Sequence, residues 1–294
     1  MVPVKHKGII YYTVCVSDLA RSIAWYNEKL GFTVTSKTCS NRFQKVVFIT
    51  NRSMKLKLVQ PAGARPLPLY RSHPGTDNAV KGNKHFSFRV DNGPQAEKEI
   101  RALNIPVVAV PVVRDTYGIF ICDSTGNLME ILQEEKPKVK TVPTKNLGSY
   151  PIPVKTWSHI AISVTDMKSS VKWYGAVLGF TLSHTDEIPT PAGNLKVTWL
   201  NAPNFCLEIF EVPGAKPVPP DRLDPATDLK TLGNKYLTLG VTDINKTAAE
   251  LKRLEVGIIS RRRNSIFIRD EDGILIELAD RPDRVFTAGF SRGS

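Results

Sequence analysis

Histidine and glutamate side chains in otherwise apolar runs are the residues of this sequence best suited to chemistry. His85 lies in "GNKHFSFRV", His159 in "KTWSHIAISV", and Glu130 and Glu208 lie in "LMEIL" and "FCLEIFEV". Imidazoles and carboxylates can transfer protons or bind a divalent metal ion. Taken singly, a strand histidine is usually a core or rim residue, and a strand glutamate often belongs to a solvent face. Their chemistry therefore depends on which elements bring them together.

The sequence contains a long internal repeat. Residues 8–34 and 155–182 both run from alternating apolar residues to an aspartate, an amphipathic segment, Trp-Tyr and Leu-Gly-Phe, with Tyr11 in the first copy where the second has His159. Tyr236 follows His85 by 151 residues, and Glu277 follows Glu130 by 147, which is close to the 148 residues between Tyr11 and His159. A nearly constant offset at three landmarks indicates two homologous modules.

Each module divides again into two similar units. Every unit begins with an apolar strand that ends at an aspartate, continues into an amphipathic helix and finishes with further strands. The aspartates suit helix N-caps, because a carboxylate accepts the free N–H groups of a first helical turn; they are Asp18, Asp91, Asp166 and Asp243. The glycine of Leu-Gly-Phe fits a helix C-cap, and the Trp-Tyr pairs before it fit the core.

The repeats predict the domain organisation. We expect a first module at residues 1–135 with units at about 7–62 and 83–133, and a second at 156–294 with units at about 156–213 and 234–281. Residues 136–155 are rich in proline and lysine and lack periodicity, which is typical of a linker.

Composition excludes several classes of protein. No apolar run approaches the roughly 20 residues of a membrane span, and the N-terminus lacks a signal-peptide core, so we expect a cytoplasmic protein without a membrane partner. The net charge is +12, but the basic residues are spread out and do not alternate with aromatic ones, which argues against nucleic acid. The exception is Arg261-Arg262-Arg263, either a solvated loop or an anion contact at a pocket rim. The four cysteines lack metal-site spacing and fit reduced core residues.

These motifs together resemble the vicinal oxygen chelate superfamily, which includes glyoxalase I, bleomycin-resistance proteins and extradiol dioxygenases. The resemblance rests on the histidine that opens a first strand, "D-x-x-x-S-x-x-W-Y-x-x-x-L-G-F" on the helix and "D-x-x-G-x-x-x-E" entering the last strand. It implies an α+β fold of two tandem modules, each of two βαβββ units curled into a cup-shaped mixed sheet. The family members share a scaffold and a metal position, not one reaction.

The resemblance also implies where ligands of one divalent metal (Fe, Mn, Ni, Co or Zn) lie. Each unit offers two positions, one in its first strand and one in its last. Pairing units within a module separates the two histidines; pairing units across modules unites His85, Glu130, His159 and Glu208. With the second pairing, the equivalent positions of the other two units form a second cup that would hold no metal; these positions are Tyr11, Lys57, Tyr236 and Glu277. A long linker, as in extradiol dioxygenases, favours the within-module alternative, in which His159 and Glu277 would share a site.

Three functions remain open at this stage. The first is a glyoxalase-like isomerase or lyase that acts through a metal-bound enediolate, with Glu130 or Glu208 as the catalytic base. The second is an extradiol-type, ring-cleaving dioxygenase that uses Fe(II). The third is a non-catalytic binding protein of the bleomycin-resistance type. In every case the expected partner is a small molecule, anionic or aromatic, and for the enzymes it carries neighbouring oxygens.

Overall fold

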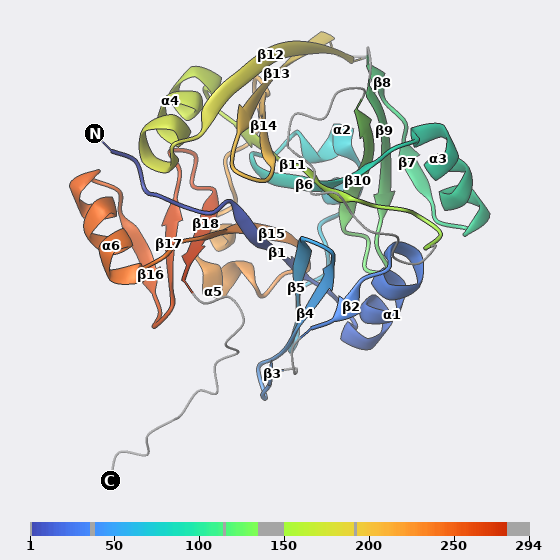
Figure 1. Cartoon of the computed structure of the whole chain (residues 1–294), viewed down its shortest axis with the longest axis horizontal. Helices are drawn as coiled ribbons and strands as arrows, with labels where there is room; N and C mark the ends of the chain where they lie inside the picture. The colour runs from blue at the N-terminus through green and yellow to red at the C-terminus, as the bar shows by residue number, and fades with distance from the viewer. Residues whose placement is uncertain (1, 36–38, 114–115, 135–149, 191–192, 281–294) are drawn as a thin grey trace.

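The computed structural model describes residues 2–35, 39–113, 116–134, 150–190 and 193–280, which form two mixed sheets flanked by helices (Figure 1). The helices are α1 (Leu19–Leu30), η1 (Leu69–Ser72), α2 (Pro74–Asp77), α3 (Gly93–Ala102), α4 (Met167–Leu178), η2 (Pro220–Arg222), α5 (Pro225–Asp228) and α6 (Ile244–Arg253). None of the helices in these ranges is both long enough and apolar enough to cross a bilayer.

The strands follow the predicted four-fold repetition of the chain. Those of the first half are β1 (Ile9–Cys15), β2 (Thr33–Val34), β3 (Cys39–Ser40), β4 (Gln44–Asn51), β5 (Met54–Pro61), β6 (Gly82–Val90), β7 (Val107–Ala109), β8 (Val112–Val113), β9 (Thr116–Cys122) and β10 (Leu128–Glu134). Those of the second half are β11 (Thr156–Val164), β12 (Thr181–Thr190), β13 (Gly193–Asn201), β14 (Cys206–Glu211), β15 (Gly233–Gly240), β16 (Ile258–Arg261), β17 (Ser265–Arg269) and β18 (Leu275–Ala279).

Each sheet combines one unit from each half of the chain. One sheet has the order β16-β17-β18-β15-β1-β5-β4-β2, with β3 also paired to β4, and so joins the first unit to the fourth. The other has the order β12-β13-β14-β11-β6-β10-β9-β7, with β8 also paired to β9, and so joins the second unit to the third. The first strands of the paired units, β1 with β15 and β6 with β11, run antiparallel at the two sheet centres.

The α+β architecture of repeated βαβββ units in two tandem modules is therefore confirmed. The partner of each unit within a sheet belongs to the other module, which is the cross-module arrangement that the distribution of histidines favoured. Most of the predicted linker lies outside the described residues, and the module boundaries at 135 and 156 stay a prediction.

The helix ends follow from local sequence. Asp18, Asp166 and Asp243 are N-caps, and their side chains accept backbone N–H groups of the first turn as expected. The fourth prediction is off by one residue, because Asn92 and not Asp91 caps α3, accepting from the N–H of Gln95. An asparagine oxygen serves this purpose as well as a carboxylate does, and Asp91 instead pairs with Lys155.

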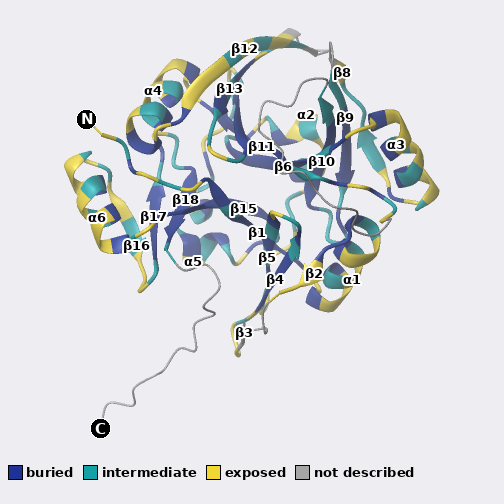
Figure 2. Ribbon diagram, viewed as in Figure 1, coloured by how far each residue is buried: buried dark blue, intermediate teal, exposed yellow. Residues whose placement is uncertain are grey.

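A continuous hydrophobic core draws on all four units (Figure 2). Each long helix has exposed residues on its outer side and buried residues on the side toward the sheets, as the helical spacing of apolar residues predicts. Two buried tyrosines from the Trp-Tyr pairs fix helices of one unit to the neighbouring unit. Tyr26 donates to Asp123 over 3.0 Å, and Tyr174 donates to Asp270 over 2.9 Å. These hydrogen bonds connect the two units of each module, and the sheets and the shared core join the modules.

Buried polar groups connect the two sheets where β6 and β15 approach each other. The side-chain amide of Asn83 donates to the carbonyl of Lys235 over 2.7 Å, and that of Asn234 donates to the carbonyl of Lys84 over 3.0 Å. Close by, Asp228 lies 3.1 Å from the ammonium of Lys235 and 3.4 Å from the guanidinium of Arg222. Because all of these groups are buried, removing one partner leaves an uncompensated charge or donor.

Candidate metal centre

Strand register places the four predicted side chains on one face of the second sheet. His85 and Ser87 are two residues apart on β6 and so point to the same face, and Ser87 is paired with Glu130 of the parallel neighbour β10. On the other side of the sheet centre, Ala161 of β11 is paired with Glu208 of β14 in the same way, two residues after the histidine of β11. The antiparallel contact between β6 and β11 then brings the two halves together.

The polar ends of these side chains converge. The Nε2 atoms of His85 and His159 are 3.0 Å apart. An oxygen of Glu130 lies 3.0 Å from the Nε2 of His159 and 3.7 Å from that of His85, and an oxygen of Glu208 lies 3.3 Å and 3.6 Å from the same two atoms. We call these four residues the first cup; all four are buried.

These separations match those expected of ligands around one metal ion. Two ligand atoms at about 2.1 Å from a shared metal are about 3.0 Å apart at a right angle and about 3.4 Å apart at a tetrahedral angle. Ligand atoms of His85, Glu130 and His159 all lie within 4.8 Å of one another, and Glu208 stands beside both histidines as a fourth donor. The donors also fit a metal chemically, because Glu130 Oε2 is a buried oxygen to which no described group donates a hydrogen bond.

The electrostatics of the first cup favour a cation. Burial and the neighbouring charges of His159 and Lys84 hold the pKa of His85 well below its usual value, so its imidazole is neutral and offers a lone pair. Burial alone would lower the pKa of His159, but the negative charges of Glu208 and Glu130 outweigh burial, so that the pKa is raised. A divalent metal would neutralise the two carboxylates more fully than a single imidazolium does.

A serine and a further glutamate orient His159 from behind. The hydroxyl of Ser158 donates to Glu134 over 2.7 Å, and its oxygen lies 3.3 Å from Nδ1 of His159. Because the serine proton is directed to Glu134, the serine oxygen is free to accept the Nδ1 proton of the histidine. This tautomer leaves Nε2 of His159 pointing into the cup as an electron-pair donor.

Aromatic side chains wall the first cup. Phe120 is paired with Glu130 on the next strand, and its ring packs edge-on against that of His85 with centroids 4.9 Å apart. Likewise, Trp199 is paired with Glu208, and its ring packs edge-on against that of His159 with centroids 5.0 Å apart. His184, which is partly exposed, stacks its ring on Trp199 with centroids 5.8 Å apart. The two residues are paired across β12 and β13.

The other sheet repeats this geometry with different side chains. Thr13 is paired with Lys57 and Thr238 with Glu277, so Tyr11, Lys57, Tyr236 and Glu277 occupy the positions equivalent to the first cup, and we call them the second cup. Tyr11 donates to Glu277 over 2.9 Å. Burial, followed by the charge of Glu277, raises the pKa of both phenols well above the usual value, so both stay protonated. Protonated phenols and an ammonium are poor metal ligands.

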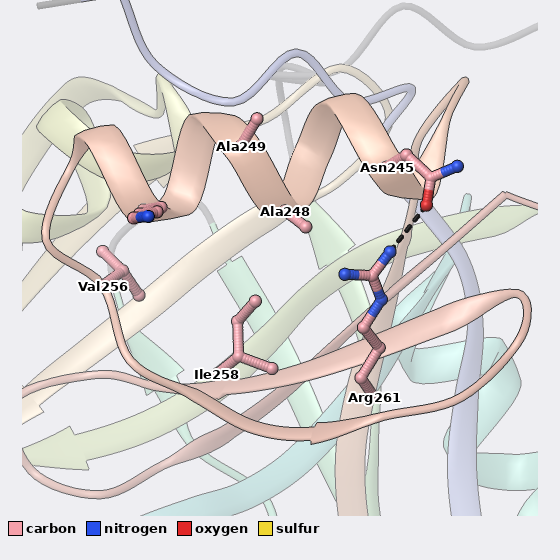
Figure 3. Close-up of a pocket in the computed structure, with 7 residues that line it drawn as sticks. Asn245, Ala248, Ala249, Val256, Ile258 and Arg261 are labelled. Atoms are coloured by element: carbon pink, nitrogen blue, oxygen red, sulfur yellow. Dashed lines mark hydrogen bonds between the residues drawn. The ribbon is translucent and has the colours of Figure 1, made fainter.

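A groove of about 560 Å³ lies elsewhere, between α6 and β16 (Figure 3). At one end of the groove Arg261 donates to Asn245, and Ala248, Val256 and Ile258 contribute apolar side chains to the lining. None of its lining residues lies on the strands that carry either cup.

Known proteins share this fold. A family model described as the Glyoxalase/Bleomycin resistance protein/Dioxygenase superfamily matches residues 8–131 and again residues 156–278. The crystal structure of glyoxalase I from Zea mays is similar over 93% of this chain and 92% of its own, with a TM-score of 0.64 and 18% identity. A structure titled putative dioxygenase from Bacillus subtilis covers 95% and 86%, with a TM-score of 0.60 and 15% identity.

At such low identities these two likenesses establish the fold alone. A comparison with curated protein sequences gives no significant match. The two family matches together span most of the chain and coincide with the two halves of the repeat. The chain therefore belongs to the Glyoxalase/Bleomycin resistance protein/Dioxygenase superfamily.

Proposed function

We propose that this protein is a metal-dependent enzyme of glyoxalase type, an isomerase or lyase acting on a small molecule with two neighbouring oxygens. One observation carries the proposal: four metal-binding side chains from two modules meet with separations of 3.0 to 3.7 Å around their imidazole nitrogens. His85, Glu130, His159 and Glu208 would hold one divalent metal. Bound there, the metal would supply a Lewis acid that stabilises negative charge developing on the substrate oxygens.

The protein's own share of this chemistry is a proton transfer. Glu130 and Glu208 are the carboxylates within reach of the reacting centre, and one of them would act as the general base that moves a proton between neighbouring substrate carbons. Phe120 and Trp199 stand on either side and would limit access of water to the reacting atoms. If the bound metal were six-coordinate, the four protein ligands would leave two positions for the substrate oxygens.

A second candidate function has an observation of its own. The tightest group in the first cup is His85, His159 and Glu130, and two histidines with one carboxylate are the ligand set of non-haem Fe(II) oxygenases. An extradiol-type dioxygenase would place a catecholic substrate and oxygen at the remaining positions.

Metal analysis followed by two activity assays separates these functions. The purified chain is stripped with a chelator and reloaded separately with Ni(II), Zn(II), Co(II), Mn(II) or, without air, Fe(II). Isomerase activity on the hemithioacetal of methylglyoxal and a thiol, without oxygen uptake, supports the main proposal. Oxygen consumption with a catechol, only in the Fe(II) form, supports the second. Failure to bind any metal refutes both and favours a binding protein.

Two matched variants identify the base. Glu130→Gln and Glu208→Gln each remove one carboxylate charge and keep the size of the side chain. The residue whose variant retains the metal but loses turnover by 10²-fold or more is the base, and the other is a ligand. Full activity in both variants would refute proton transfer by either residue.

A further inference from the structure

The second cup contains a carboxylate with one oxygen that accepts two hydrogen bonds inside the protein. The Oε2 atom of Glu277 accepts a hydrogen bond from Tyr11 over 2.9 Å and another from Thr238 over 2.9 Å. Glu277 and both of its donors are buried. This carboxylate is therefore a fixed part of the wall.

Two other groups of the second cup lack such partners. The hydroxyl of Tyr236 is fully buried and forms no hydrogen bond with any residue that the structure describes. Lys57 is half-buried, and its Nζ lies 5.7 Å from the centre of the Tyr11 ring; no ion pair of Lys57 is found among the described residues. An unpaired buried donor costs free energy, so a ligand that accepts from both groups would be stabilised.

A third donor stands at the rim. The guanidinium of Arg262 lies 5.3 Å from the centre of the Phe267 ring, which in turn packs edge-on against Tyr236 at 5.0 Å. Burial lowers the pKa of Lys57, the charge of Glu277 opposes this shift, and the charge of Arg262 adds to it. Two cations therefore face one carboxylate, and the cup carries an excess of one positive charge when Lys57 is protonated.

We propose that the second cup is a metal-independent binding site for a small monoanionic carboxylate with an apolar body. The unpartnered hydroxyl of Tyr236 and the ammonium of Lys57 donate to the carboxylate, and Arg262 closes over it from the rim. A single negative charge balances the excess charge, whereas a phosphate dianion would meet repulsion from Glu277. The rings of Phe48 and Phe267, which pack edge-on against Tyr11 and Tyr236, contact the apolar body.

This proposal is independent of the proposed function, because the site contains no metal ligand of the first cup. It is tested with the full chain stripped of metal, using benzoate labelled with ¹³C at the carboxylate as the probe. Titration followed by NMR should give saturable binding with one site per chain. Tyr236→Phe and Lys57→Met should each weaken it by about tenfold or more, since each removes a donor to a charged group. Arg262→Ala should weaken it less, because that side chain is exposed.

The controls keep the test decisive. Tyr236→Phe removes only an oxygen that has no partner, so the variant is expected to fold at least as stably as the parent. His159→Ala disrupts the first cup and should leave benzoate binding unchanged. No saturable binding to the parent, equal binding in Tyr236→Phe and Lys57→Met, or loss of binding in His159→Ala would each overturn the proposal.

Discussion

Replacing Tyr11 by phenylalanine removes one hydroxyl from the second cup. That hydroxyl donates to Glu277 over 2.9 Å in a buried environment, and after its loss the carboxylate retains the hydrogen bond from Thr238. A buried hydrogen bond to a charged group contributes about 1.5–3 kcal/mol, so the free energy of unfolding should fall by about 2 kcal/mol. For a chain of 294 residues, with an unfolding entropy of about 2.1 cal/mol/K per residue, that loss lowers Tm by roughly 3 °C. The metal content should not change, because the first cup is untouched.

His159→Phe is the matched variant, because His159 occupies the position of the repeat equivalent to Tyr11. It removes a ligand of the first cup and should abolish metal binding while the chain still folds. Both variants are compared by urea unfolding and by metal content after loading with Zn(II). Loss of the metal from Tyr11→Phe, or retention of the metal by His159→Phe, would refute the assignment of the cups. An unfolding free energy of Tyr11→Phe within about 0.5 kcal/mol of the parent would refute the hydrogen-bond argument.

Three further predictions concern neighbouring groups. Ser158→Ala should weaken metal binding by about 10–100-fold with the fold intact, because the orientation of His159 is lost, and chelator competition measures this. Asp228→Asn should destabilise the chain by about 3–5 kcal/mol in urea unfolding, because Arg222 loses a buried partner. Burial raises the pKa of Asp270 from 3.8 to about 7, so the native state holds this proton more tightly than the unfolded state does. That stabilisation is complete below pH 3.8 and is lost as the pH rises through 7. Between these two pH values, the free energy of unfolding of the parent should therefore fall by up to roughly 4 kcal/mol relative to that of Asp270→Asn. Urea unfolding of both proteins at each pH measures this difference.

The repeat architecture was accessible from the sequence because its signals are local. An aspartate before an amphipathic helix and a glycine after it specify the helix ends wherever the chain lies, and Gly31 and Gly179 do adopt the left-handed conformation that stops a helix. The cap at Asn92 was missed by one residue because two adjacent side chains could both accept the N–H groups of that turn.

Which two units share a sheet was harder to predict from the sequence, because the periodicity of the strands is the same for either pairing of the units. The choice of β11 as the neighbour of β6 depends on packing between units that are far apart in the sequence, which no local pattern records. Residue types gave the useful hint, since both histidines fall in units that can share a sheet only across modules. The stacking of His184 on Trp199 depends on side-chain orientation and could not be predicted.

The central claim is that one metal binds between the two modules. A crystal of the chain loaded with Co(II), measured at the cobalt absorption edge, tests it directly. The account predicts one anomalous peak per chain, within about 2.0–2.3 Å of ligand atoms from His85 and Glu130 on one module and His159 and Glu208 on the other. A peak bounded by His159 and Glu277, by the second cup, or by ligands from one module alone would contradict it.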